Sequence, residues 1–128
     1  MTNEQSRLYV GVADFEQPTL LVLGKPDSLL WLSKQISARR AFALEREAGK
    51  SYASLQFLPT AGDGHLTRQG NAFEWQLSAL ESKQVAQQIK ELAVSDCPAH
   101  AYLDPAFNEA EVQVIVSINE YDVSRIFG

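Results

Sequence analysis

The sequence predicts a single α+β domain, in which a mostly antiparallel sheet of about six strands carries two helices on one face. Its 128 residues are the size of one domain, and 45% apolar against 21% charged residues is the balance of a globular protein. Apolar residues alternate with period two in several short segments, and two segments with helical spacing interrupt them in the order ββα-ββα-ββ. Since no linker or low-complexity tract divides these elements, we expect one domain over residues 1–128.

The first three elements occupy the N-terminal third of the chain. Leu8 to Ala13 alternates as a half-buried strand does, and Thr19 to Leu23 is apolar on both faces, which is typical of a central strand. Asp27 or Ser28 then offers a side-chain oxygen that can cap a helix, and helical spacing continues to Ala41.

The middle of the chain is less regular. Residues 42–50 are compatible with an extension of the helix or with a short extended piece, and the pattern leaves this open. Ser51 to Leu58 reads as a strand. Residues 60–71 contain three glycines, which predicts a loop or a mobile hairpin tip. Phe73 to Ser78 alternates as a half-buried strand.

The second helix has the clearest signals. Ser78 followed by Glu81 three residues later is a capping-box pattern at a helix start. The helix ends near Pro98, and its inward stripe consists of Val85, Ala86, Ile89, Leu92 and Ala93. Two strands follow, His100 to Asp104 and Glu111 to Ile118, and the pattern leaves open whether they pair as a hairpin across residues 105–110.

A short repeat links the two helices. The triplet Ser33-Lys34-Gln35 recurs as Ser82-Lys83-Gln84 at a similar distance from the preceding strand. This leaves open whether the chain contains two copies of a ββα unit followed by a last hairpin.

Charge is distributed unevenly along the chain. The formal net charge of the chain is −5. Residues 91–128 contain seven acidic side chains and one basic side chain, Arg125, which gives this segment a charge of −6. Between Lys34 and Lys50 the sign reverses to +3. Because an acidic surface repels phosphate backbones, we expect no nucleic-acid partner.

The sequence predicts a cytoplasmic protein without membrane contact. No apolar run approaches the ~20 residues that span a bilayer, and no signal-peptide core follows the polar N-terminus. The lone cysteine, Cys97, cannot form an internal disulfide bond.

Neither a cofactor nor a metal ion is expected. The glycine-rich stretch at residues 62–65 lacks the Lys-Ser or Lys-Thr and the helix start that a phosphate loop needs. Cys97 and His100 stand three residues apart and His65 is the only other histidine, so a second ligand pair for structural zinc is missing. Cys97 among acidic residues also lacks the positive setting of a nucleophilic thiol.

One group of polar residues near the C-terminal end of the sequence is a candidate for catalysis. On a strand, His100, Tyr102 and Asp104 project from the same face, and hairpin pairing brings them near Glu120 and Tyr121. His100 with Asp104 or Glu120 could perform acid–base catalysis in a small hydrolase or isomerase. Tyrosines and acids on an exposed sheet face serve equally well as partner contacts.

The segment His-x-Tyr-Leu-Asp, followed by Val-x-Val-Ile-Val-Ser-x-x-Glu-Tyr at residues 112–121, resembles a C-terminal signature of small bacterial proteins. Some of those proteins are encoded near polymorphic-toxin immunity genes. The resemblance covers about the last quarter of the chain. It implies a small cytosolic α+β protein that works by binding, and it implies no particular reaction.

The main interpretation is therefore a non-enzymatic, immunity-like interaction module whose acidic C-terminal surface meets a basic protein partner. Acidic side chains would steer the partner, and tyrosines would anchor it. The predicted contact residues are Tyr102, Asp104, Glu109, Glu111, Glu120, Tyr121 and Asp122. The small hydrolase or isomerase remains the alternative, and a structural homo-oligomer such as a homodimer is the third interpretation.

Overall fold

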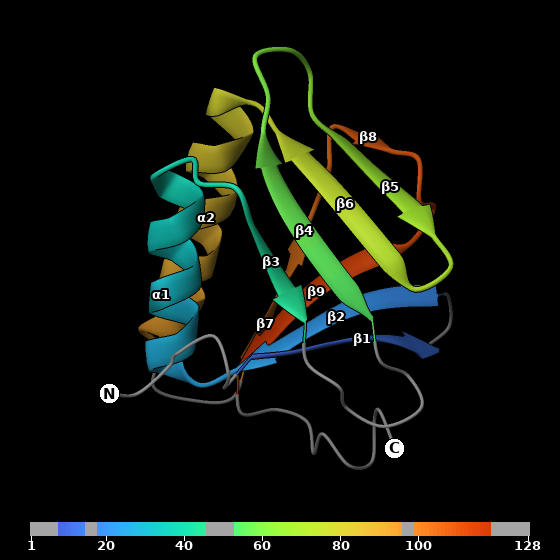
Figure 1. Ribbon diagram of the computed structural model, residues 1–128. Coiled ribbons are helices and arrows are strands. Elements are labelled where there is room, and N and C mark those ends of the chain that lie inside the picture. The colour runs from blue at the N-terminus through green and yellow to red at the C-terminus, as the bar shows by residue number, and fades with distance from the viewer. Residues whose placement is uncertain (1–7, 15–17, 46–52, 96–98, 119–128) are drawn as a thin grey trace.

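The computed structural model describes residues 8–14, 18–45, 53–95 and 99–118, which form two helices and nine strands (Figure 1). The predicted α+β class is confirmed. The finer prediction of one mostly antiparallel sheet with about six strands was wrong, because the strands form two mixed sheets. The helices stand side by side at one end of both sheets, so they do not cover one face of a single sheet (Figure 1).

The first sheet, sheet A, has four strands in the order β1-β2-β9-β7. Its strands are β1 (Tyr9–Asp14), β2 (Pro18–Gly24), β9 (Gln113–Ile118) and β7 (Ala99–Leu103). The two outer pairs are antiparallel and the central pair, β2 with β9, is parallel. The last two long strands pair antiparallel, with His100 opposite Ser117, although β8 of the other sheet lies between them in the sequence.

The second sheet, sheet B, has five strands in the order β3-β4-β6-β5-β8. Its strands are β3 (Phe42–Glu45), β4 (Ser54–Pro59), β6 (Ala72–Leu77), β5 (His65–Gln69) and β8 (Phe107–Asn108). Residues 42–45, which the sequence left undecided, are thus a strand. Of the two alternatives for residues 60–71, a loop throughout was wrong, because β5 lies within the segment and pairs with β6 and β8, while residues 70–71 do form the turn of the β5–β6 hairpin.

The helices are α1 (Pro26–Ser37) and α2 (Ala79–Ala93). The capping box between Ser78 and Glu81 is confirmed at the start of α2. The capping prediction for α1 was wrong: Lys25 is the N-cap residue without a side-chain hydrogen bond, and proline follows it. α1 also ends earlier than expected, because Arg39 adopts a left-handed backbone conformation with φ of 55° that a helix cannot continue through.

The core lies between the inner faces of the two sheets and the facing stripes of both helices. Trp75 is fully buried and stacks against Phe57, which stacks in turn against Phe42. Between the helices, the buried Ser33 hydroxyl donates a hydrogen bond of 2.7 Å to the carbonyl oxygen of Ala86. The predicted inward stripe of α2 is confirmed by burial of Val85, Ala86, Ile89, Leu92 and Ala93.

The strand pairing follows the same pattern in the two halves of the chain. Each half of the chain, residues 8–59 and 65–118, contributes two paired strands before its helix and two paired strands after it, and the second half also contains the short β8. The first pair joins one sheet and the second pair joins the other, so each sheet is completed by the opposite half (Figure 1). The order β1-β2-β9-β7 therefore corresponds to β5-β6-β4-β3, and both central pairs are parallel.

The registers of the two sheets agree residue by residue. In sheet A, Val22 lies opposite Val10 on one side and Val116 on the other. In sheet B, Trp75 lies opposite Leu66 on one side and Phe57 on the other. All six side chains are buried in the core. The two halves therefore have equivalent strand registers.

The Ser-Lys-Gln triplets do not mark this repeat. Ser33 lies in the second half of α1, whereas Ser82 lies in the first turn of α2. The repeating unit is ββαββ, with two further strands beyond the ββα unit that the sequence left open.

Candidate functional site

One of the predicted contact residues, Tyr102, lies on β7, the edge strand of sheet A. Tyr102 is 53% exposed and is one of four large hydrophobic side chains with high exposure in the described part of the chain. The imidazole of His100, also exposed, meets the Tyr102 ring edge-on with ring centroids 5.3 Å apart. The strand thus presents an aromatic pair to solvent.

Asp104 follows β7 at the junction of two hollows in the surface. Tyr102, Asp104 and Glu111 line one hollow of about 640 Å³ together with Val112. Asp104 also lines a second hollow of about 700 Å³ along α2, beside Leu80 and Glu91. Leu80 is 66% exposed, so each hollow combines an exposed apolar side chain with carboxylates.

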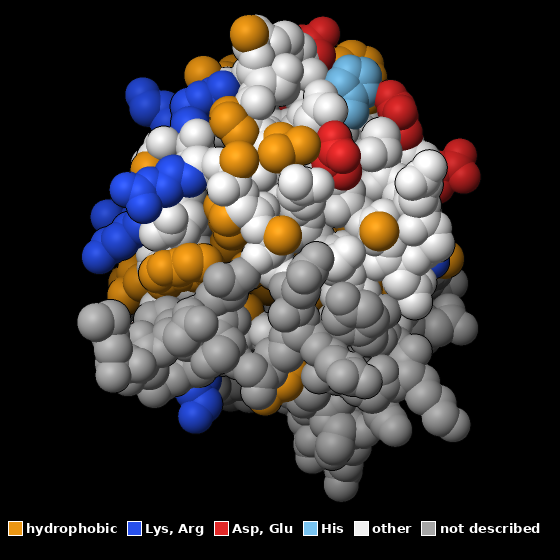
Figure 2. Space-filling view, in the orientation of Figure 1, with side chains coloured by type: hydrophobic (Ala, Val, Ile, Leu, Met, Phe, Trp, Pro, Cys, Tyr) orange, Lys and Arg blue, Asp and Glu red, His pale blue; other side chains and the backbone are white. Residues whose placement is uncertain are grey.

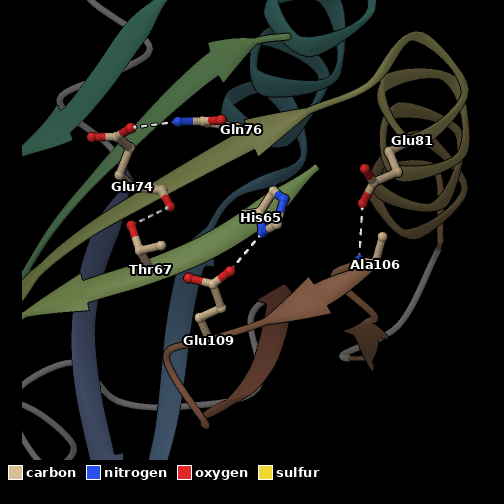
Figure 3. Close-up of polar contacts among 7 residues, drawn as sticks. All are labelled: His65, Thr67, Glu74, Gln76, Glu81, Ala106 and Glu109. Atoms are coloured by element: carbon tan, nitrogen blue, oxygen red, sulfur yellow. Dashed lines mark hydrogen bonds and ion pairs between the residues drawn. The ribbon is translucent and has the colours of Figure 1, made fainter. Parts of the chain in front are cut away.

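Glu109 lies elsewhere, in the β8 region of sheet B. Its Oε1 is 2.7 Å from Nδ1 of His65, and both side chains are partly exposed (Figure 3). The His65 ring also stacks against Phe107, with centroids 4.9 Å apart. The segment that carries Glu109 is therefore held on β5 by His65 and by the β5–β8 pairing.

His65 was missed as a structural contact of this region, because the glycine-rich stretch around it predicted a loop. In sheet B it lies opposite Gln76, next to the pair formed by Thr67 and Glu74. These four side chains share the outer face of the sheet (Figure 3). Among residues 65–69 only Leu66 is apolar, so no alternation along the sequence indicates this strand.

Glu81 fixes the chain directly after Asp104. Its Oε1 accepts hydrogen bonds from the backbone and hydroxyl of Ser78, as part of the capping box. Its Oε2 accepts a hydrogen bond of 3.0 Å from the backbone N–H of Ala106 (Figure 3). Because Glu81 is only 9% exposed, the start of α2 and the segment after β7 are held together by one buried carboxylate.

Charge separates across the face in Figure 2. Basic side chains gather on the side of α1, whereas acidic side chains and a histidine lie on the side of β5 and β8. Asp104, Glu109 and Glu111 are all exposed, and they lie within eight residues of the chain between β7 and β9. The predicted residues Glu120, Tyr121 and Asp122 lie outside the described residues.

The predicted acid–base group of His100 with Asp104 or Glu120 stays a prediction, because Glu120 lies outside the described residues. His100 is not among the residues that line either hollow around Asp104, and its ring contact is with Tyr102. Glu120 and Cys97 lie outside the described ranges. His65 and Glu109 do form a pair, but both are open to solvent, with 37% and 57% of their side-chain surfaces exposed.

Within residues 8–14, 18–45, 53–95 and 99–118, no group of three or more histidine, cysteine, aspartate and glutamate side chains is arranged to hold a metal ion. Neither of the helices described combines the length and the apolar character needed to cross a membrane.

No protein-family model matches the chain, and no curated protein is significantly similar to it.

Proposed function

We propose that the protein is a non-enzymatic interaction module that binds a basic protein partner through the segment between β7 and β9. The observation that carries the proposal is the position of Asp104 between two hollows, each edged by an exposed apolar side chain, Tyr102 or Leu80. Exposed aromatic residues flanked by polar groups are typical of protein interfaces.

The charge of this segment supports a basic partner. Asp104, Glu109 and Glu111 give residues 104–111 a charge of −3 without a lysine or arginine among them. Such a surface accelerates the approach of a positively charged partner and disfavours acidic ones. Since Glu81 and His65 each hold one part of the segment, its acidic side chains are displayed on a fixed backbone.

The sequence resemblance directs the choice of partner. Proteins with the similar C-terminal signature include some encoded near polymorphic-toxin immunity genes, so a basic toxin domain is the first partner to test. In this proposal the protein acts in the cytoplasm and neutralises its partner by covering it. Tyr121, Glu120 and Asp122 would extend the same acidic surface.

A photo-crosslinking experiment tests the proposal. The crosslinker p-benzoylphenylalanine replaces Tyr102 in the full-length chain, and a matched protein carries it at Gln56, an exposed position on the outer face of sheet B. We expect a basic protein to crosslink at position 102 and not at position 56. Crosslinking should weaken as salt rises, because exposed charges are screened beyond about 8 Å at physiological ionic strength.

Charge-reversed variants provide the control. Asp104→Lys with Glu111→Lys should abolish the crosslink, whereas Asp27→Lys with Asp63→Lys makes the same change in net charge at exposed positions elsewhere and should retain it. Equal crosslinking at positions 56 and 102, or equal effects of the two double variants, would contradict the proposal.

A further inference from the structure

The two halves of this chain depend on each other for their sheets. Residues 8–59 supply β1 and β2 to sheet A and β3 and β4 to sheet B, while residues 65–118 supply the remaining strands of each. Within the described residues, β2 meets β9 and β4 meets β6 along six residue pairs each. Neither half contains a complete sheet.

The contacts between halves are also extensive in the core. The hydrogen bond from Ser33 to Ala86 joins the two helices, and the stack of Phe57 on Trp75 joins the halves within sheet B. After the C-terminal end of α1, the Arg39 guanidinium donates to the carbonyl oxygen of Leu77 and to the Ser82 hydroxyl. All of these contacts could form equally well between halves that belong to two chains.

From this architecture we propose that a second copy of the chain is a binding partner through reciprocal exchange of halves. In the exchanged dimer, residues 8–59 of each copy pair with residues 65–118 of the other. Every core contact is kept, so the two states differ only in the connection at residues 60–64 and in the entropy of association. Exchange of identical elements is a low-cost route to dimers for this reason.

The connection decides which state forms. In sheet B, β6 lies between β4 and β5, so the connection must cross two strand spacings, about 10 Å. Six peptide steps from Pro59 to His65 reach about 20 Å when extended, which is enough to pass over the chain where β6 leads into α2 (Figure 1). Short flexible connections give effective concentrations in the millimolar range, so the native length favours closure within one chain.

Shortening the connection should reverse this preference. Deleting Ala61, Gly62 and Asp63 leaves three steps, about 10 Å, which cannot both cross two strand spacings and clear the end of β6. All three residues are exposed, and a side chain at Gly62 would meet no atom within 4 Å, so the deletion removes little packing. We expect the shortened chain to elute with twice the 14.2 kDa mass of one chain.

A disulfide bond distinguishes exchange from ordinary dimerisation. Gln56 and Glu74 are register partners on β4 and β6, one in each half. In a Cys97→Ser background, Gln56→Cys with Glu74→Cys should oxidise within one chain at native length and between two chains after the deletion. The matched control replaces residues 61–63 with three glycines and should behave as the native length does.

A second measurement keeps the proposal testable if the shortened chain fails to fold. This measurement uses two full-length variants in the Cys97→Ser background, one carrying Gln56→Cys and the other carrying Glu74→Cys. The two variants are mixed, unfolded and refolded together at about 1 mM, because at that concentration association between chains competes with closure within one chain. Exchange predicts a disulfide-linked heterodimer that disappears on refolding at a hundredfold dilution. Absence of that product at 1 mM, or a shortened chain that folds as a monomer with its disulfide within one chain, would overturn the proposal.

Discussion

Arg39 joins four parts of the fold. Replacing it should change the free energy of unfolding in two ways, through its hydrogen bonds and through its left-handed backbone conformation. The residue follows α1 with φ of 55°, and its guanidinium donates to the carbonyl oxygens of Thr60 at 2.9 Å and Leu77 at 3.4 Å and to the Ser82 hydroxyl at 3.2 Å. It thus ties the end of α1 to the ends of β4 and β6 and to the start of α2.

The hydrogen bonds of Arg39 stabilise the fold, whereas its left-handed backbone conformation destabilises it. Hydrogen bonds from a charged donor contribute about 1.5–3 kcal/mol, and since only one of the three is short, we assign about 2 kcal/mol to the set. The left-handed backbone costs a residue with a Cβ atom about 1 kcal/mol relative to glycine. Arg39→Ala should therefore lose about 2 kcal/mol of the free energy of unfolding, and Arg39→Gly about 1 kcal/mol.

Urea unfolding followed by tryptophan fluorescence measures both variants, because the buried Trp75 reports on the core. The exposed neighbour supplies the control, and Arg40→Ala should change stability by less than about 0.5 kcal/mol. If Arg39→Ala is as harmless as Arg40→Ala, the bridging contacts do not stabilise the fold. If Arg39→Gly is less stable than Arg39→Ala, the left-handed backbone at this position does not lower the free energy of unfolding.

Two further substitutions test close packing elsewhere. A Cβ atom at Gly64 would overlap the carboxylate of Glu81, so Gly64→Ala should lose more than about 2 kcal/mol in the same urea assay, whereas Gly62→Ala should be close to neutral. Ser33→Ala removes the buried hydrogen bond between the helices and should cost about 1 kcal/mol. A neutral Gly64→Ala, or a Ser33→Ala change no larger than that of the exposed Ser37→Ala, would show that the respective contact is not tight.

The sequence predicted most elements because local periodicity controls them. β1 and β2 begin and end within one residue of the predicted bounds, and the capping box places the start of α2 correctly. Val112, Val114, Val116 and Ile118 are all buried, as their alternation indicates. Local patterns, however, contain no information on which strands become neighbours, so one sheet was predicted where two exist.

β5 shows how tertiary contacts override a local signal. Three glycines around residues 60–71 indicate a loop, yet Leu66 is fully buried and its carbonyl oxygen accepts a hydrogen bond from Ala110. The strand is stabilised on one side by β6 and on the other by β8, which is 40 residues away in the sequence. For the same reason the pairing of His65 with Glu109 was not predictable, although the exposed positions of Tyr102 and Asp104 were expected.

The two halves differ in the charge of one pair of corresponding connections. The connection between β3 and β4 and the connection between β7 and β9 occupy corresponding positions in the two halves. Both make the same anchoring hydrogen bond to the first strand of their half, from Ala53 to Val10 and from Ala110 to Leu66. Yet residues 46–52 carry a net charge of +1, whereas residues 104–111 carry −3. The core registers of the two halves agree while these connections differ in charge, so the pairing of the strands does not depend on the charge of the connections. In the proposed function, only the connection between β7 and β9 contacts the partner.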